Sequence, residues 1–309
     1  IQTLKAPLKA AKKNQDHWAE GMGNVFLGEA LWRLGEYDNA KKKLNYALQI
    51  ATQNDLRLLL GWCHHHLGII SDIQSQYATA FEHLEEACNA WRMLDNSQAL
   101  CNSLNSIGIV SYHRGNLKSA QKIMESALKL CNELDNRHLQ TLLLNSLSTL
   151  ATEQGDYNGA QYYLQLSLGL AVNTGNQPMQ GTIQTNLGRN HYLQGNFDDA
   201  IIHLKRGLET VDRLGDRSTT VVALLHLAKA NREINKIISA EAYCHEALNV
   251  ARKNKLRRLE FEALLDLALI CSVKDKNQAR VYWGEAFIIA QEFQNEQLLE
   301  NANNILSKI

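Results

Sequence analysis

The sequence predicts an all-α fold, a solenoid of seven packed helix pairs with further helices at both ends. The first observation is a column of alanines that recurs every 40 residues, and once after 39, along almost the whole chain. The second is a set of turn residues that recurs twice in each interval. The third is the scarcity of proline, with only Pro7 and Pro178 in 309 residues. A fixed period of about 20 to 50 residues is typical of repeat proteins. The alanines of the column are Ala40, Ala80, Ala120, Ala160, Ala200, Ala240 and Ala279.

Other columns share this period and predict how the helices of one repeat pack. A small residue stands seven positions after each alanine, and a residue that can fill an apolar site stands four after it, as at Ala47 and Leu44. A second small residue, which follows Leu or Ile, stands twelve positions before the alanine. Small residues let two helix backbones approach closely, and large ones fill the space between them. The second small column consists of Gly28, Gly68, Gly108, Ser148, Gly188 and Ala228.

Turns divide each repeat into two helices. One kind of turn places a helix-ending glycine before a cap and an apolar residue, as in Gly115-Asn116-Leu117, Gly155-Asp156-Tyr157 and Gly195-Asn196-Phe197. A second kind lies 20 residues out of phase, as in Leu134-Asp135-Asn136. Helices of about 15 to 18 residues are expected between the turns, each roughly 25 Å long.

The elements are expected to follow one another in a fixed order. Residues 1–14 form the second helix of an earlier repeat, residues 16–295 form seven repeats of about 40 residues, and residues 296–309 form a terminal first helix. Sixteen helices in a single solenoid domain, residues 1–309, are therefore predicted. The last segment exposes apolar residues such as Leu298 and Leu299, and the chain begins with Ile1 rather than Met. We expect a longer chain, or self-association through the terminal helices.

Composition excludes several classes of protein. Lys plus Arg and Asp plus Glu both number 32, so the usual electrostatic case for nucleic-acid or membrane-surface binding is absent. No apolar run approaches the roughly 18 residues that cross a bilayer, and the chain does not start like a signal peptide. Six cysteines without a CxxC motif do not resemble a secreted disulfide framework. A cytoplasmic protein is expected.

The columns resemble the tetratricopeptide repeat family, whose pattern places Leu-Gly, an aromatic residue or Leu, Ala, Phe or Leu, and Ala at these offsets. The resemblance covers roughly residues 16 to 295, although the repeat here has 40 residues where the family commonly has about 34. It implies a right-handed superhelix in which the first helix of each repeat lines the concave groove. The spacing and turns such as Leu214-Gly215-Asp216 are similar to the helical sensor domains of MalT-type bacterial transcriptional regulators, and to kinesin light chain.

Motifs for catalysis and for cofactors are absent from the sequence. It contains no P-loop, no Gly-x-Ser-x-Gly and no dinucleotide-binding Gly-x-Gly-x-x-Gly. In the segment His245-Glu246-Ala247-Leu248-Asn249, Asn249 stands where a zinc protease has its second histidine. No cofactor and no metal site are predicted, and we expect no enzymatic activity.

Two runs of residues leave alternatives open. The histidines of the run 63–66, Cys-His-His-His, point about 100° apart on a helix and cannot all bind one ion, so they either form a partial metal site or line the groove. The basic run from Arg252 to Arg258 is either a phosphate-binding patch or a solvated turn whose cations are favoured at the end of a helix.

The expected groove gives the candidate binding residues. The resemblance implies that the first helices present side chains at positions near each Leu-Gly pair, and Asn186 in Thr-Asn-Leu-Gly matches the family's ligand-binding asparagine. Aromatic residues dominate the early repeats, whereas amides and cations dominate the later ones. The alternative is that these residues are only a hydrated groove wall. The candidates are Trp32, His65, His66, Asn105, Tyr112, Asn145, Asn186, Arg189, Tyr192, Lys229 and Arg232.

The sequence therefore predicts a non-catalytic scaffold. Its concave groove is expected to bind a protein or peptide segment, or a small effector, because amides bridge main-chain groups and cations bind carboxylates. The alternative, implied by the similarity to MalT-type regulators, is the effector-sensing arm of a larger signal-transduction ATPase and transcriptional regulator. An enzyme that uses Cys63 or the histidines is the least favoured hypothesis.

Overall fold

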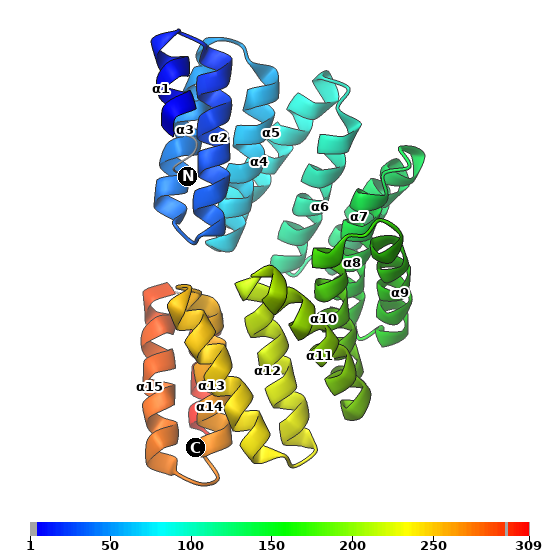
Figure 1. Cartoon of the computed structure of the whole chain (residues 1–309), viewed down its shortest axis with the longest axis vertical. Coiled ribbons are helices and arrows are strands. Elements are labelled where there is room, and N and C mark those ends of the chain that lie inside the picture. The colour runs from blue at the N-terminus through cyan, green and yellow to red at the C-terminus, as the bar shows by residue number, and fades with distance from the viewer. Residues whose placement is uncertain (1–4, 294–295, 309) are drawn as a thin grey trace. The chain divides into compact units, whose positions relative to one another are not determined.

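The computed structural model describes residues 5–293 and 296–308, and every regular element in these ranges is an α-helix (Figure 1). The predicted all-α class is confirmed, with 16 helices among the described residues. Residues 1–4, 294–295 and 309, which belong to the predicted terminal helices and to the turn before the last one, lie outside the described residues.

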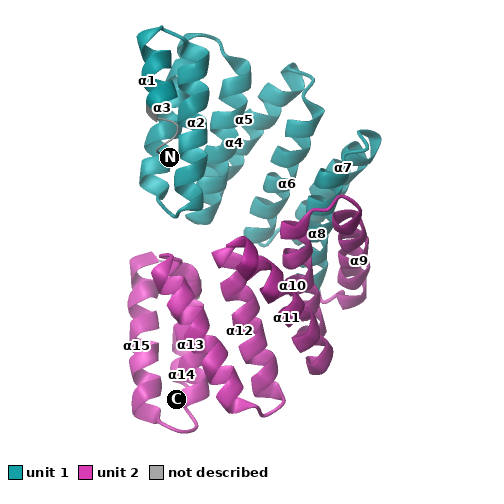
Figure 2. Ribbon diagram, in the orientation of Figure 1, with its two compact units in different colours: residues 1–154 teal, residues 155–309 magenta. Residues whose placement is uncertain are grey.

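The helices fall into two compact units, residues 1–154 and 155–309 (Figure 2), and each is described by itself. Unit 1 contains α1 (Lys5–Lys13), α2 (His17–Arg33), α3 (Tyr37–Gln53), α4 (Arg57–Ile73), α5 (Tyr77–Met93), α6 (Ser97–His113), α7 (Leu117–Glu133) and α8 (Arg137–Glu153). Unit 2 contains α9 (Tyr157–Asn173), α10 (Gln177–Leu193), α11 (Phe197–Leu214), α12 (Arg217–Glu233), α13 (Ile237–Lys253), α14 (Arg257–Cys271), α15 (Lys276–Phe293) and α16 (Glu296–Leu306).

A left-handed residue ends the helices at a strict interval. Positive φ recurs at every twentieth residue from Gln15 to Lys255, and glycine occupies six of these positions, among them Gly155 with φ of 78°. Glycine is favoured there because it has no Cβ to clash in this conformation. The caps vary more than the sequence predicts. Asp156 accepts a hydrogen bond from the backbone N–H of Gly159 at 2.9 Å, whereas the side chains of Asn116 and Asn196 form no cap hydrogen bond.

The small columns bring the two helices of a repeat together. Ala80 is completely buried, and a Cβ added to Gly68 would lie 3.2 Å from the carbonyl oxygen of Ala80 and 2.6 Å from Cγ of Leu84. Gly188 meets Ala200 and Leu204 in the same way in unit 2. The backbone of the first helix thus contacts the second helix directly, as the columns predict.

The first helices form the inner layer of each unit. Successive first helices pack on one another, α2 on α4, α4 on α6 and α6 on α8 in unit 1, and α10 on α12, α12 on α14 and α14 on α16 in unit 2. The second helices make no comparable contacts with one another in the described parts of the chain. Because the layer with the closer spacing lies on the inside of a curve, the first helices line the concave face of each unit.

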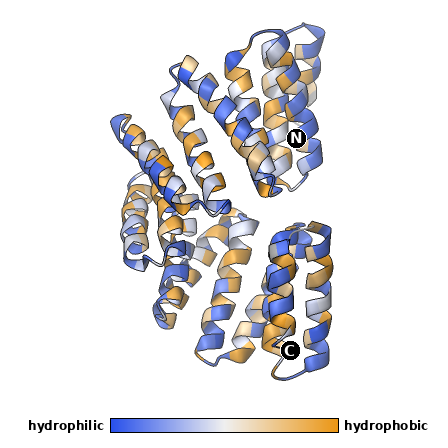
Figure 3. Cartoon of the chain, turned by 180° about the vertical axis from the view of Figure 1, so that it is seen from behind, coloured by the Kyte–Doolittle hydropathy of each residue, from blue (hydrophilic) through white to orange (hydrophobic). Residues whose placement is uncertain are grey.

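Hydrophobic residues are distributed along the helices rather than concentrated in one of them. Figure 3 shows hydrophobic and hydrophilic residues alternating on each helix, as expected for helices with one buried side. Within the described ranges, none of the helices combines the length and the apolar character needed to cross a membrane.

The close approach of the helices predicts opposite effects of the same substitution at two glycines. Gly188→Ala should lower the free energy of unfolding by about 1 to 3 kcal/mol, because its Cβ would lie 2.9 Å from the carbonyl oxygen of Ala200. Gly284→Ala in α15, where a Cβ meets nothing within 4 Å, should raise it by about 0.5 to 1 kcal/mol. Urea unfolding followed by circular dichroism measures both, and equal effects would contradict the packing.

Candidate functional site

The predicted site residues of unit 1 all lie on its first helices. Trp32 is on α2, His65 and His66 are on α4, Asn105 and Tyr112 are on α6, and Asn145 is on α8. Four of them are partly exposed, but His65 and His66 are only 8% and 6% exposed. The two histidines therefore pack within unit 1, and the remaining four give it a partly exposed row.

A hydrogen-bonded aromatic cluster surrounds the buried histidines. Trp62 stacks on His66 with ring centroids 6.0 Å apart and meets Trp91 edge-on at 5.2 Å. The indole N–H of Trp91 donates to the Ser103 hydroxyl at 3.0 Å, and that hydroxyl lies 2.9 Å from Nδ1 of His65. The Ser103 hydroxyl thus joins the two rings, since it accepts from the indole and forms a second hydrogen bond with His65.

Burial keeps these histidines neutral. It lowers the pKa of His65 to about 3, with a smaller contribution from His66. It also lowers the pKa of His66 to about 4, assisted by the charge of Arg33. The neutral rings, His66 stacked on Trp62 and His65 edge-on to it, form an apolar support for the inner face of α4.

The sequence prediction missed Trp91 and Ser103, although both break their columns. Trp91 stands where other repeats have residues such as Ala51 and Ala171, and the ring occupies the space above Gly61, where a Cβ would lie 2.5 Å from it. Ser103 stands where other repeats have Cys63, Leu143 and Ile183. The sequence did contain a signal, because Trp91 and Ser103 both differ from the residues at the equivalent positions of the other repeats.

Aromatic groups also line the inner face at α2. Phe26 is 50% exposed, and the guanidinium of Arg33 lies 5.1 Å from the Trp32 ring centroid. The indole nitrogen of Trp32 and Oδ1 of Asn105 are buried without a hydrogen-bond partner. Buried polar atoms of this kind usually have a partner, so these two atoms are exceptions among the inner-face residues of unit 1.

The predicted site residues of unit 2 form a partly exposed row on two adjacent first helices. Asn186, Arg189 and Tyr192 lie on α10, and Lys229 and Arg232 lie on α12. The Tyr192 ring lies 6.3 Å from the ring of His226 on α12. The amide, cations and aromatic ring expected in the later repeats are thus brought together within unit 2.

A partly buried carboxylate, that of Asp266, lies behind this row and was missed by the sequence prediction. Nζ of Lys229 lies 3.5 Å from Oδ2 of Asp266 on α14. Burial opposes a charge on Lys229, but Asp266 and Glu262 outweigh it and raise the pKa of the lysine. Arg232 is paired with Glu233 at 2.9 Å. Lys229 and Arg232 therefore have anionic partners, so the row is a set of oriented N–H donors rather than a block of positive charge.

The family model of the tetratricopeptide repeat matches residues 21–93, 99–171, 142–213 and 179–253. The chain belongs to the tetratricopeptide repeat family. No curated protein matches its sequence.

Solved structures of other tetratricopeptide repeat-like proteins share the fold at low sequence identity. The Rap conjugation gene regulator of plasmid pLS20, in complex with the Phr* peptide, is 16% identical with a TM-score of 0.73, over 92% of this chain and 77% of that one. The apo quorum sensor NprR of B. thuringiensis is 13% identical, with a TM-score of 0.69, over 91% and 80%.

A third structure is a signal transduction ATPase with numerous domains (STAND) from Pyrococcus horikoshii, which carries a tetratricopeptide repeat sensor. It is 14% identical with a TM-score of 0.61, and the match covers 92% of this chain but only 44% of that one. At these identities the similarities establish the fold.

The cysteines of this tetratricopeptide repeat protein are buried and reduced. All six are free, and burial raises the pKa of Cys63 to about 12. It raises the pKa of Cys88 to about 11. A thiol of this kind is a poor nucleophile, because the thiolate is the reactive form. No group of three or more His, Cys, Asp or Glu side chains gathers around a possible metal position in the described parts of the chain.

The three arginines of the basic run, Arg252, Arg257 and Arg258, form ion pairs. Nε of Arg252 lies 3.0 Å from Glu260, and the same guanidinium also contacts Glu285. Arg257 lies 2.8 Å from Glu260 and also pairs with Glu292. These carboxylates occupy the donors that a phosphate would need, so of the two alternatives the structure favours a solvated turn held by ion pairs.

The partly buried His226 of unit 2 predicts a loss of stability in acid. Burial, with Lys229 and Arg189 adding to it, lowers the pKa of His226 from 6.5 to about 3. The unfolded chain then binds more protons between these pH values, so stability decreases as pH falls from about 6.5 toward 3. His226→Leu should reduce the stability lost between pH 6.5 and 4.5 by roughly 1 to 2 kcal/mol.

Urea unfolding at a series of pH values measures the slope of the free energy of unfolding against pH. His17→Leu, at an exposed position at the start of α2, is the control and should leave it unchanged. An unaltered slope in the His226 variant would show that this ring does not govern the acid transition.

Proposed function

We propose that the protein is a non-catalytic scaffold that binds a peptide or protein segment on the inner faces of its first helices. The observation that carries the proposal is the partial exposure of aromatic, amide and cationic side chains there, such as Trp32, Asn186 and Arg189. The second helices hold the opposite side of each first helix in the core, so these residues are not needed for packing within a repeat.

The side chains suit an extended main chain. Asparagine offers both a donor and an acceptor to a peptide group, and Arg189 and Arg232 offer donors to carbonyls and carboxylates. In unit 1 the exposed ring of Phe26 suits a segment with an apolar side chain. The complex of the similar Rap regulator with the Phr* peptide shows that a protein of this fold holds a peptide.

The proposal includes an intracellular, non-enzymatic role. Burial raises the pKa of the Cys63 and Cys88 thiols, the described residues contain no metal-binding cluster, and the six unpaired cysteines fit a reducing compartment such as the cytoplasm.

Removal of the unit 2 row tests the proposal. Peptides selected from a random displayed library by the full chain should bind the Asn186→Ala/Arg189→Ala/Arg232→Ala variant at least about tenfold more weakly, since each lost charge-assisted hydrogen bond contributes roughly 1.5 to 3 kcal/mol. The matched control is Lys205→Ala/Arg206→Ala, which removes two exposed cations from α11, a second helix.

Fluorescence anisotropy with the selected peptides gives the affinities, and circular dichroism verifies that each variant folds. Unchanged affinity in the triple variant, or an equal loss in the control, would overturn the assignment to the inner face.

A second candidate function is the sensor arm of a larger signal-transduction ATPase. The similarity to the STAND protein favours it, because there the same fold spans 44% of a longer chain that carries a sensor. The inner face would then bind an effector, and the nucleotide-binding part would belong to the same polypeptide.

The size of the native gene product separates the two candidates. The sensor hypothesis expects a product far larger than 34.8 kDa in immunoblots and intact-mass spectra from the native cells. A product near that mass would support the hypothesis of a free-standing scaffold and rule out the hypothesis of a sensor arm of an ATPase.

A further inference from the structure

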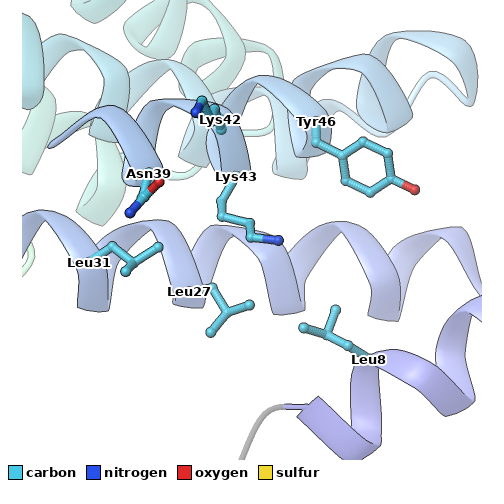
Figure 4. Close-up of a pocket in the computed structure, with 7 residues that line it drawn as sticks. All are labelled: Leu8, Leu27, Leu31, Asn39, Lys42, Lys43 and Tyr46. Carbon is cyan, nitrogen blue, oxygen red and sulfur yellow. The ribbon is translucent and has the colours of Figure 1, made fainter. Parts of the chain in front are cut away.

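A pocket of about 570 Å³ lies between α1, α2 and α3 of unit 1, away from the inner-face rows described above. Leu8, Leu27 and Leu31 supply its apolar wall, and Lys42, Lys43 and Tyr46 stand on the α3 side (Figure 4). Leu27 is only 6% exposed, so the deepest part of the pocket is continuous with the core. The volume lies within the roughly 300 to 1,000 Å³ typical of small-molecule sites.

The pocket arises from one departure in the repeat pattern. Three residues after each column alanine, six repeats carry a ring or a branched side chain that is partly buried: His83, Ile123, Tyr163, His203, Tyr243 and Tyr282. The first repeat has Lys43 there, and Lys43 is exposed. A thin, flexible lysine stem does not fill the space that a ring fills, so the leucines beneath it are left open. Figure 4 shows Lys43 reaching from α3 toward α2.

The two lysines of the rim are not neutralised by the protein. Neither Lys42 nor Lys43 takes part in any ion pair found among the described residues. The nearby carboxylate of Glu20 is occupied, because it accepts a hydrogen bond of 2.7 Å from the Tyr46 hydroxyl. The pocket thus combines an apolar wall with unpaired ammonium groups at its mouth.

We propose that this pocket binds a small amphiphilic carboxylate of the medium-chain fatty acid class. Its hydrocarbon chain lies on Leu8, Leu27 and Leu31, where burial removes apolar surface from water. Its carboxylate lies at the mouth with Lys43, and the lysine stem covers part of the chain. A neutral apolar ligand would leave the ammonium groups unused, and a doubly charged phosphate without a chain would leave the leucines exposed.

Calorimetric titration of the full chain with sodium decanoate, below its micelle concentration, tests the proposal. The wild-type chain should bind one decanoate. Lys43→Tyr restores the ring that other repeats carry and should abolish binding. Lys43→Met keeps an apolar stem without the charge and should weaken binding about fivefold, which is the contribution of a partly exposed ion pair. Lys122→Met, at the position of α7 that corresponds to Lys42, is the matched control and should bind as the wild type does.

Several results would overturn the proposal. These are the absence of saturable binding to the wild type, undiminished binding to the Lys43→Tyr variant, and an equal loss in the Lys122→Met control. A wild-type dimer that Lys43→Tyr dissociates in sedimentation velocity would assign the pocket to a second copy instead. Circular dichroism verifies that the variants fold. The Asn186→Ala/Arg189→Ala/Arg232→Ala variant should bind decanoate normally, which separates this site from the proposed peptide site.

Discussion

The close approach of two helix backbones inside each repeat is the constraint on which the rest of the structure depends. It exists because a small residue of the first helix faces a small residue and a large one of the second, as Gly68 faces Ala80 and Leu84. This contact uses the back of every first helix and leaves its front free of packing within the repeat. The inner faces therefore carry Asn186, Arg189 and other polar residues at little expense in stability, and a binding surface becomes compatible with the fold.

Periodicity was sufficient to predict the features that recur. It predicted the helix pairs, the left-handed glycines and the buried alanine column, because each of these is repeated with the same local physics. Capping was less predictable. Asn116 and Asp156 occupy equivalent positions, but only Asp156 forms the cap hydrogen bond, since the orientation of one side chain is decided by its own neighbours. The repeated turn residues predicted where each helix begins, but not which hydrogen bond each capping side chain forms.

The candidate site was predicted in position but not in environment. The row of unit 2 lies on the helices expected, yet Asp266, which pairs with Lys229, comes from a helix about 40 residues further on and carries no motif of its own. His65 was expected to face the groove and is buried by a network that joins it to Ser103 and Trp91. Such contacts depend on the offset between neighbouring repeats, which the spacing of the columns does not specify.

A residue that differs in size from the others of its column can be interpreted by whether the neighbouring side chains fill or vacate the space accordingly. Trp91 is far larger than the residues of its column, but the facing residue is Gly61, whose missing side chain accommodates the ring, and the indole N–H finds Ser103. That departure is absorbed into the core and forms a rigid support. Lys43 is the opposite case, because it replaces a ring and no larger side chain fills the space, which stays open above Leu27. In a repeat protein the equivalent positions of the other repeats serve as the comparison, since they show which residue the fold alone requires. By that comparison a compensated departure serves packing, whereas an uncompensated one that adds unpaired charge to an apolar wall has the composition of a ligand site.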